Sequence, residues 1–205
     1  MKAESPFRQP QDGEAVRPNV LRRTAALAAV LLTAWLPAWA AISRQEALKA
    51  AYPQAEFRSE RVFLSQDQQN QAAEIAGVEV PTALIARYLA SRDGQQVGRA
   101  YVDTHVVRTK KESLLICLNA DGTLKRIETT AFLEPPEYEA PEEWRRQYHG
   151  KALKGDLNLN RDIRPLAGAT LTARAVNRAV RRVMAIDQVL RQEPGRPAPG
   201  KGGGR

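Results

Sequence analysis

The sequence predicts an α+β fold: a small, mainly antiparallel sheet with packed helices and a long C-terminal amphipathic helix, in a single domain. Two patterns support this prediction. Apolar and polar residues alternate between turn signals over residues 97–132, as in adjacent antiparallel strands. Apolar residues then recur at helical spacing from residue 171 to residue 190. With 205 residues, 43% hydrophobic and 26% charged, the chain suits one globular domain with appendages and excludes a multi-span membrane protein.

Residues 1–40 are predicted to be a signal peptide. Arg22 and Arg23 precede the apolar run 24–36, and residues 38–40 have the small-x-small pattern of a cleavage site. We therefore expect an exported, periplasmic protein. The apolar run is shorter than the roughly 20 residues that span a bilayer. Cleavage is the preferred interpretation for this reason, and an uncleaved tether to the inner membrane is the alternative.

Residues 41–97 are expected to form an N-terminal helix and strand extension. Ser43 and Glu46 have the spacing of a capping box, which predicts a short helix. A short strand is expected at 61–65, followed by a helix that begins near residue 66 and continues towards Ala76.

Residues 98–132 contain the strands that define the expected sheet. His105 alternates with the valines of its strand and faces away from them, and we interpret it as a surface histidine without a catalytic partner. Residues 113–118 and 123–132 flank the turn 119–122 and form the clearest hairpin. Cys117 lies among apolar residues, which predicts a buried strand thiol.

The last helix is predicted to run from Leu171 to about Leu190. Its apolar face consists of Ala175, Val176, Ala179, Val180, Val183, Ile186 and Leu190. Its opposite face carries Arg174, Arg178 and Arg181, which we expect to be solvated. The tail, residues 191–205, is rich in proline and glycine and basic, and is expected to be disordered.

The turn before this helix is the candidate functional site. Pro165 stops any preceding helix, Gly168 permits a left-handed backbone, and Thr170 or Thr172 can serve as the N-cap. The free N–H groups and the positive dipole end of such a turn stabilise a phosphate. A simple helix cap is the alternative that the local pattern leaves open.

The run Gly168-Ala169-Thr170-Leu171-Thr172 and the residues up to Val176 resemble the signature of the FMN-binding domain. This domain occurs in the flavin subunits of sodium-pumping NADH:quinone reductase and of the Rnf electron-transport complex. In that family, a flavin transferase joins FMN through its phosphate to the last threonine of a Ser/Thr-Gly-Ala-Thr motif. The resemblance implies covalent FMN on Thr170, with Gly168, Ala169, Leu171 and Thr172 as further cofactor-binding residues.

The resemblance covers residues 98–190 and implies further site residues. The family has an acidic residue upstream of the threonine, and Asp162 is the nearest candidate. It also has a Glu-Thr-Pro-Gly loop, which Glu134-Pro135-Pro136-Glu137 replaces here, so Glu134, Pro136 and the adjacent Tyr138 are expected to contact the flavin.

Three departures from the family pattern bear on the flavin. Ala167 replaces the usual Ser/Thr, and Asp162 lies about one residue farther from Thr170 than the common spacing; both affect recognition by the transferase. Pro135 and Glu137 alter the loop that contacts the ring. Trp144 and Tyr148 lie four residues apart and offer aromatic surface for a flavin. The preferred interpretation is that they pack their helix onto the sheet.

The expected function is that of an exported electron carrier with covalent FMN. Its expected partners are a flavin transferase and membrane or periplasmic electron-transfer proteins. The net charge of +6 from residue 41 onward would also suit an anionic membrane surface. The alternative is a non-redox binding or sensing module that keeps the fold without flavin. Nucleic-acid binding is not expected, because no helix-turn-helix, RNP-like or zinc pattern occurs. His105 and His149 lack metal-ligand spacing, and no metal site is expected.

Overall fold

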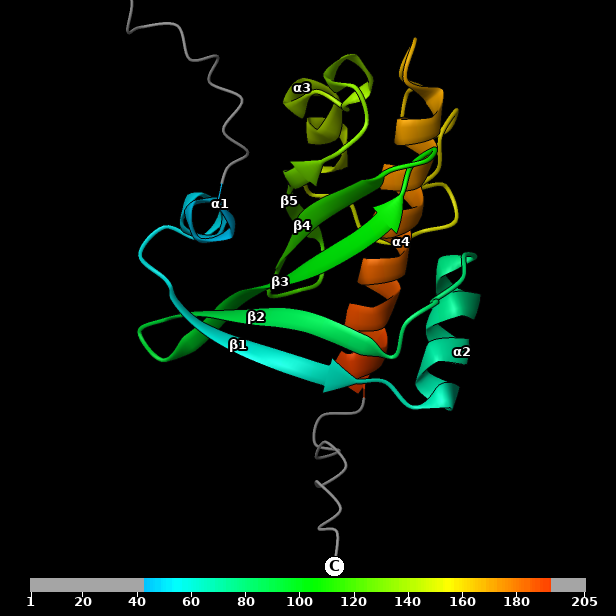
Figure 1. The fold of residues 1–205 in the computed structure, drawn as a ribbon. Coiled ribbons are helices and arrows are strands. Elements are labelled where there is room, and N and C mark those ends of the chain that lie inside the picture. Colours follow the sequence, from blue (N-terminus) through cyan, green and yellow to red (C-terminus); the bar gives the residue numbers. More distant parts are fainter. Residues whose placement is uncertain (1–42, 193–205) are drawn as a thin grey trace, which may run out of the picture. The chain divides into compact units, whose positions relative to one another are not determined.

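The computed structural model describes residues 43–192, which lie within one compact unit (Figure 1). These residues form a five-stranded sheet with helices on both faces, so the predicted α+β class with a long C-terminal helix is confirmed. The predicted signal peptide and residues 193–205 lie outside the described residues.

The sheet is an antiparallel meander in which each strand pairs with the next strand in sequence. Its strands are β1 (Glu56–Phe63), β2 (Leu84–Arg92), β3 (Gln95–Val106), β4 (Lys111–Asn119) and β5 (Leu124–Phe132). The first strand begins five residues earlier than the predicted strand 61–65, because its first half is mainly polar and gives no apolar pattern. The expected limit between residues 97 and 98 falls inside β3, so both expected segments contribute strands to one sheet.

Two tight turns connect the central strands, and both follow from local sequence. Asp93 and Gly94 adopt φ angles of 51° and 74°, which suits the two-residue turn between β2 and β3. In the β4–β5 turn, Gly122 has a φ of 91° and its N–H donates to the Asn119 carbonyl at 3.0 Å. The predicted hairpin around residues 119–122 is therefore confirmed.

Helices cover both faces of the sheet (Figure 1). On one face lies α1 (Arg44–Ala51), whose predicted capping box between Ser43 and Glu46 is confirmed. On the other face lie α2 (Gln66–Ala76) and α4 (Thr170–Gln192). Between β5 and α4 the chain forms three short helices: η1 (Pro136–Tyr138), α3 (Glu142–Arg145) and η2 (Arg146–Tyr148).

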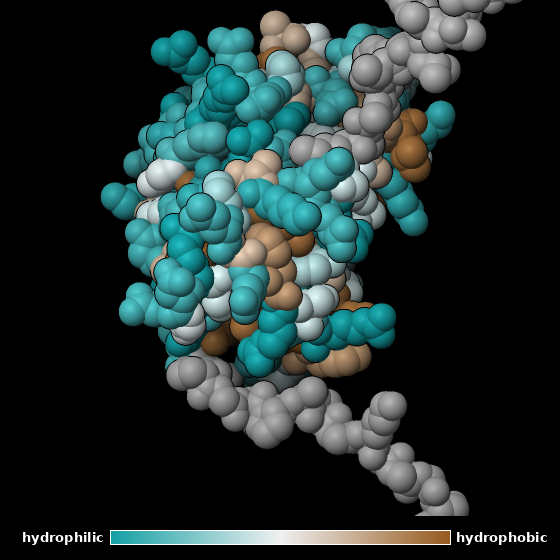
Figure 2. All heavy atoms as spheres, turned by 90° about the vertical axis from the view of Figure 1, so that its left-hand side faces the viewer, coloured by the Kyte–Doolittle hydropathy of each residue, from teal (hydrophilic) through white to brown (hydrophobic). Residues whose placement is uncertain are grey.

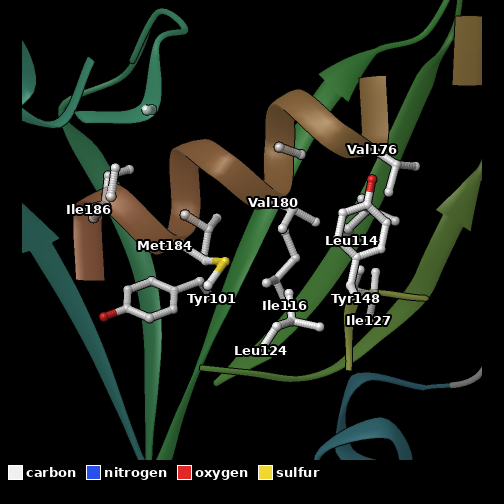
Figure 3. Packing of buried hydrophobic residues seen from close by; sticks show 14 of the residues in the cluster. Tyr101, Leu114, Ile116, Leu124, Ile127, Tyr148, Val176, Val180, Met184 and Ile186 are labelled. Atoms are coloured by element: carbon white, nitrogen blue, oxygen red, sulfur yellow. The ribbon is translucent and has the colours of Figure 1, made fainter. Parts of the chain in front are cut away.

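Each face of the sheet has its own apolar core. The larger core packs α4 against the sheet, with Val180 and Met184 of the helix directed towards Ile116 and Leu124 (Figure 3). The smaller core packs α1 against the other face and includes Cys117, which is fully buried as predicted. Seen from the side that carries α1, the surface is mainly hydrophilic (Figure 2).

Burial extends around most of α4 and corrects one expectation. Most of the predicted apolar face is buried, with Ala175 and Leu190 half-buried, and Arg174 and Arg178 are exposed. Arg181 is buried, however, because its Nε donates to the Ala76 carbonyl at 2.7 Å and so caps the end of α2. The expected solvated arginine face is therefore wrong at this residue. Within residues 43–192, no helix combines the length and the apolar character needed to cross a membrane.

Candidate functional site

A pocket of about 250 Å³ lies at the start of α4. It is lined by Val107, Arg108, Glu134, Tyr138, Gly168, Ala169, Thr170, Leu171 and Thr172. The lining thus brings together all of the expected cofactor-binding residues except Asp162 and Pro136. The chain reaches α4 through Gly168, whose φ of 79° is in the left-handed region that glycine adopts without strain.

The two threonines at this helix start differ in their surroundings. Thr172 is buried, and its Oγ1 donates to the Tyr138 carbonyl at 2.7 Å. Thr170 is exposed and faces the pocket, and within residues 43–192 its hydroxyl makes no hydrogen bond. Neither residue is the N-cap, because the helix begins at Thr170 and is preceded by Ala169. The expectation of a threonine cap is therefore wrong, and Thr170 is the hydroxyl left available for chemistry.

The first turn of α4 presents backbone N–H groups to the pocket. The intrahelical hydrogen bonds begin with the Ala173 N–H, which donates to the Ala169 carbonyl at 3.0 Å. The N–H groups of the three residues before Ala173 have no carbonyl one turn earlier within the helix, as at every helix start. Together with the positive end of the helix dipole, they favour an anion.

Glu134 braces one wall of the pocket. Its Oε1 accepts hydrogen bonds from the backbone N–H groups of Thr109, Lys110 and Arg108 at 2.6, 2.7 and 3.3 Å. These N–H groups hold the pKa of Glu134 below its ordinary range, and those of Thr109 and Lys110 have the largest effect. The carboxylate therefore fixes the loop between β3 and β4, which supplies Val107 and Arg108 to the lining.

The remaining expected residues take different positions. Tyr138 lines the pocket and is 40% exposed, whereas Pro136 starts η1 without lining it. Asp162 lies in the loop before α4, where its carboxylate is 3.9 Å from Lys151 Nζ, and it does not line the pocket.

Trp144 and Tyr148 belong to the core. Trp144 Nε1 donates to the Arg164 carbonyl at 2.8 Å, and the Tyr148 hydroxyl accepts from Asn177 Nδ2 at 3.1 Å. The two rings meet edge to face with centroids 5.7 Å apart. The prediction that these aromatic residues pack their helix onto the sheet is confirmed.

A cluster of charged side chains near the site was not predicted from the sequence. His105 is mostly buried, with Nδ1 2.9 Å from Asp103 Oδ1 and Nε2 3.0 Å from Glu112 Oε2. Asp103 in turn accepts hydrogen bonds from Nε and Nη2 of Arg182 at 2.8 and 2.9 Å. His105 is therefore not the unpartnered surface histidine that we expected. The Asp-x-His spacing puts both side chains on one face of the strand, but Glu112 could be found only from the strand register.

The charges of this cluster depend on the protonation of His105. Burial lowers the pKa of His105, but the hydrogen bonds to Asp103 and Glu112 outweigh burial and raise it to about 9. Burial likewise opposes the charge of Asp103, whose pKa is nevertheless lowered by His105 and Arg182. At neutral pH the cluster therefore contains an imidazolium between the Asp103 and Glu112 side chains, with the Arg182 guanidinium on the other side of Asp103.

Within residues 43–192, no group of three or more His, Cys, Asp or Glu side chains is arranged to hold a metal ion.

Comparison with known proteins adds no further assignment to this site. No family model matches the sequence, and a search of curated proteins finds no match.

Proposed function

We propose that this protein is an exported flavoprotein that carries FMN through a phosphoester to Thr170 and transfers electrons in a membrane-associated redox chain. The observation that carries this proposal is the Thr170 hydroxyl, which is exposed, free of hydrogen bonds within residues 43–192, and placed in a pocket at a helix start. The neighbouring Thr172 has the same chemistry but is buried and engaged. The structural contrast therefore favours Thr170, the residue that the resemblance implies.

The residues at the helix start fit a phosphate. An ester at Thr170 Oγ1 keeps the phosphate beside the first-turn N–H groups of α4, which can donate to its oxygens. Gly168, two residues before Thr170, has a left-handed backbone, and apart from its chain neighbours no atom lies within 4 Å of where a Cβ would stand. No basic side chain is needed to hold the phosphate.

The pocket also fits one part of a flat aromatic group. Tyr138 and Leu171, which are 40% and 48% exposed, provide apolar surface in its lining. Pockets that enclose a drug-sized ligand measure roughly 300–1,000 Å³, so the 250 Å³ here would leave a flavin partly open to partners. Bound FMN supplies one- or two-electron redox chemistry, and the chain supplies attachment and orientation. Partial exposure suits a carrier that exchanges electrons with other proteins.

The proposed partners follow from this chemistry. A flavin transferase is needed for maturation, and membrane or periplasmic redox proteins would donate and accept the electrons. Covalent attachment suits an exported protein because a dissociated flavin would be lost by dilution. The part of the chain after the predicted signal peptide, with 26 Lys and Arg against 20 Asp and Glu and hence a net charge of +6, is also compatible with an anionic membrane surface.

Co-expression with a flavin transferase tests the proposal. Denaturing electrophoresis followed by a fluorescence scan should show a yellow-fluorescent band for the natural chain. Thr170→Ala should abolish the band, whereas Thr172→Val should retain it, because valine has nearly the shape of threonine and removes only the hydroxyl and its hydrogen bond to the Tyr138 carbonyl. A band that survives Thr170→Ala and disappears with Thr172→Val would contradict the residue assignment.

The second candidate function is a non-redox binding or sensing module. The specific observation that favours it is Ala167, which lies directly before Gly168. The resembled motif has Ser or Thr at this position, so the transferase would meet a different side chain here. Absence of any fluorescent band from a soluble, folded natural chain, with a positive control substrate labelled in the same cells, would favour this function over electron transfer.

A further inference from the structure

A second, larger pocket lies beside the site at Thr170. Its volume is about 500 Å³, and it lies between β3, the start of β2 and the stretch of α4 from Leu171 to Ile186. Val107 and Leu171 line both pockets, so the two are neighbours along α4. The larger pocket falls within the roughly 300–1,000 Å³ that small-molecule sites usually have. The proposed attachment of FMN does not use it.

Exposed apolar side chains gather around this pocket. Residues 43–192 include six exposed large hydrophobic side chains, and three of them, Leu84, Val106 and Leu171, line it. They are 46%, 56% and 48% exposed. Val183 and Ile186 of α4 add buried apolar wall. Apolar surface that is exposed and concentrated at one concave place marks a binding site.

The charged groups of the same pocket are predominantly cationic. Arg174 and Arg178 lie one helical turn apart on α4, are exposed, and make no hydrogen bond or ion pair within the described part of the chain. The one carboxylate of the lining, Asp103, is already bound by Arg182 and His105. The pocket therefore contains two guanidinium groups that have no anionic partner among the described residues.

We propose that this pocket binds a small amphipathic anion, namely an apolar chain or ring that bears one carboxylate. The apolar body fits between the strand residues Leu84 and Val106 and the helix residue Leu171, and the carboxylate accepts hydrogen bonds from Arg174 and Arg178. A neutral ligand leaves both guanidinium groups unpaired, and a cationic ligand is repelled by them. The charge of the pocket therefore selects the ligand.

Titration calorimetry on the flavin-free full chain tests this inference with three probes of equal chain length. These are decanoate, decanol and decyltrimethylammonium, each used below the concentration at which it aggregates. Decanoate should bind at one site, and the alcohol and the ammonium should bind roughly tenfold or more weakly, because charge-assisted hydrogen bonds to arginine are lost. Equal affinity for decanoate and decanol, or no binding of decanoate, would overturn the proposal.

Two variants with equal loss of charge locate the site. Arg174→Gln/Arg178→Gln should weaken decanoate binding by roughly tenfold. Lys49→Gln/Arg61→Gln removes two exposed cations, from α1 and from β1, that lie outside the pocket, and should leave the affinity unchanged. A third variant, Val106→Glu, places a carboxylate at an exposed lining residue and should abolish decanoate binding. If the two double variants weakened decanoate binding equally, the assignment of the site to this pocket would be wrong.

The outcome is separable from the flavin proposal. Thr170→Ala removes the proposed flavin attachment point, which lines only the smaller of the two pockets, and should bind decanoate as the natural chain does. A chain that binds decanoate but never accepts flavin would support this inference and contradict the proposed electron carrier. A chain that accepts flavin but does not bind decanoate would support the proposed electron carrier and contradict this inference.

Discussion

Raising the pH should destabilise the protein through one residue, His105. This imidazole lies between the carboxylates of Asp103 and Glu112, and its side chain is only 13% exposed. Its pKa is raised from an ordinary 6.5 to about 9 in the folded protein. Because the folded state holds the proton more tightly than the unfolded state, the stabilisation is complete below about pH 6.5 and is lost as the pH rises through about 9.

The magnitude follows from the two pKa values. Each pKa unit corresponds to about 1.36 kcal/mol, so the protonated histidine contributes about 3 kcal/mol to the free energy of unfolding at about pH 6. Urea unfolding of the natural chain should show this loss between about pH 6 and about pH 10. His105→Gln should be less stable at low pH by a similar amount, and its stability should depend much less on pH over this range.

His149→Gln provides the matched control. His149 is the only other histidine and is exposed, and the part of its ring that is shielded from water, together with nearby Arg126, lowers its pKa. This variant should keep the pH dependence of the natural chain above neutral pH. A natural chain whose free energy of unfolding stays constant across this range, or a His105→Gln variant with an unchanged slope, would refute the reasoning.

Three further predictions concern stability and pocket geometry. Asp187→Ala should lower the free energy of unfolding by about 3–5 kcal/mol in urea titrations, because it leaves the buried Arg99 without its carboxylate partner; a loss below about 1 kcal/mol would contradict this. Gly98→Ala should lower the free energy of unfolding by about 1–3 kcal/mol, since a Cβ there would overlap Tyr52 Cε1 and lie 2.6 Å from the Leu118 carbonyl oxygen; an unchanged melting temperature would count against it. Glu134→Gln should speed amide hydrogen exchange in the loop between β3 and β4, because the charge that accepts its N–H groups is lost, and exchange as slow as in the natural chain would disprove that role.

Local signals in the sequence were enough to predict several elements. The capping box at Ser43, the turn at Gly122 and the helix that follows Gly168 each depend on a few neighbouring residues, and the structure has them where expected. The core face of α4 was also predictable, since it follows from helical periodicity alone.

The roles of buried polar side chains depended on tertiary contacts that local sequence does not contain. Arg181 has the sequence position of a solvated arginine, but its guanidinium reaches the carbonyl end of α2 more than 100 residues away. His105 meets Glu112 only because the register of β3 and β4 sets them opposite each other. The different fates of Thr170 and Thr172 likewise depended on the Tyr138 carbonyl, which accepts one of the two hydroxyls.

The most direct measurement is the intact mass of the purified chain after exposure to a flavin transferase. The proposal predicts a species heavier than the polypeptide by FMN less one water, and a tryptic fragment map that places the addition on Thr170. A spectrum that shows only the unmodified polypeptide, from a preparation in which a known substrate is fully modified, would contradict the proposed flavin attachment.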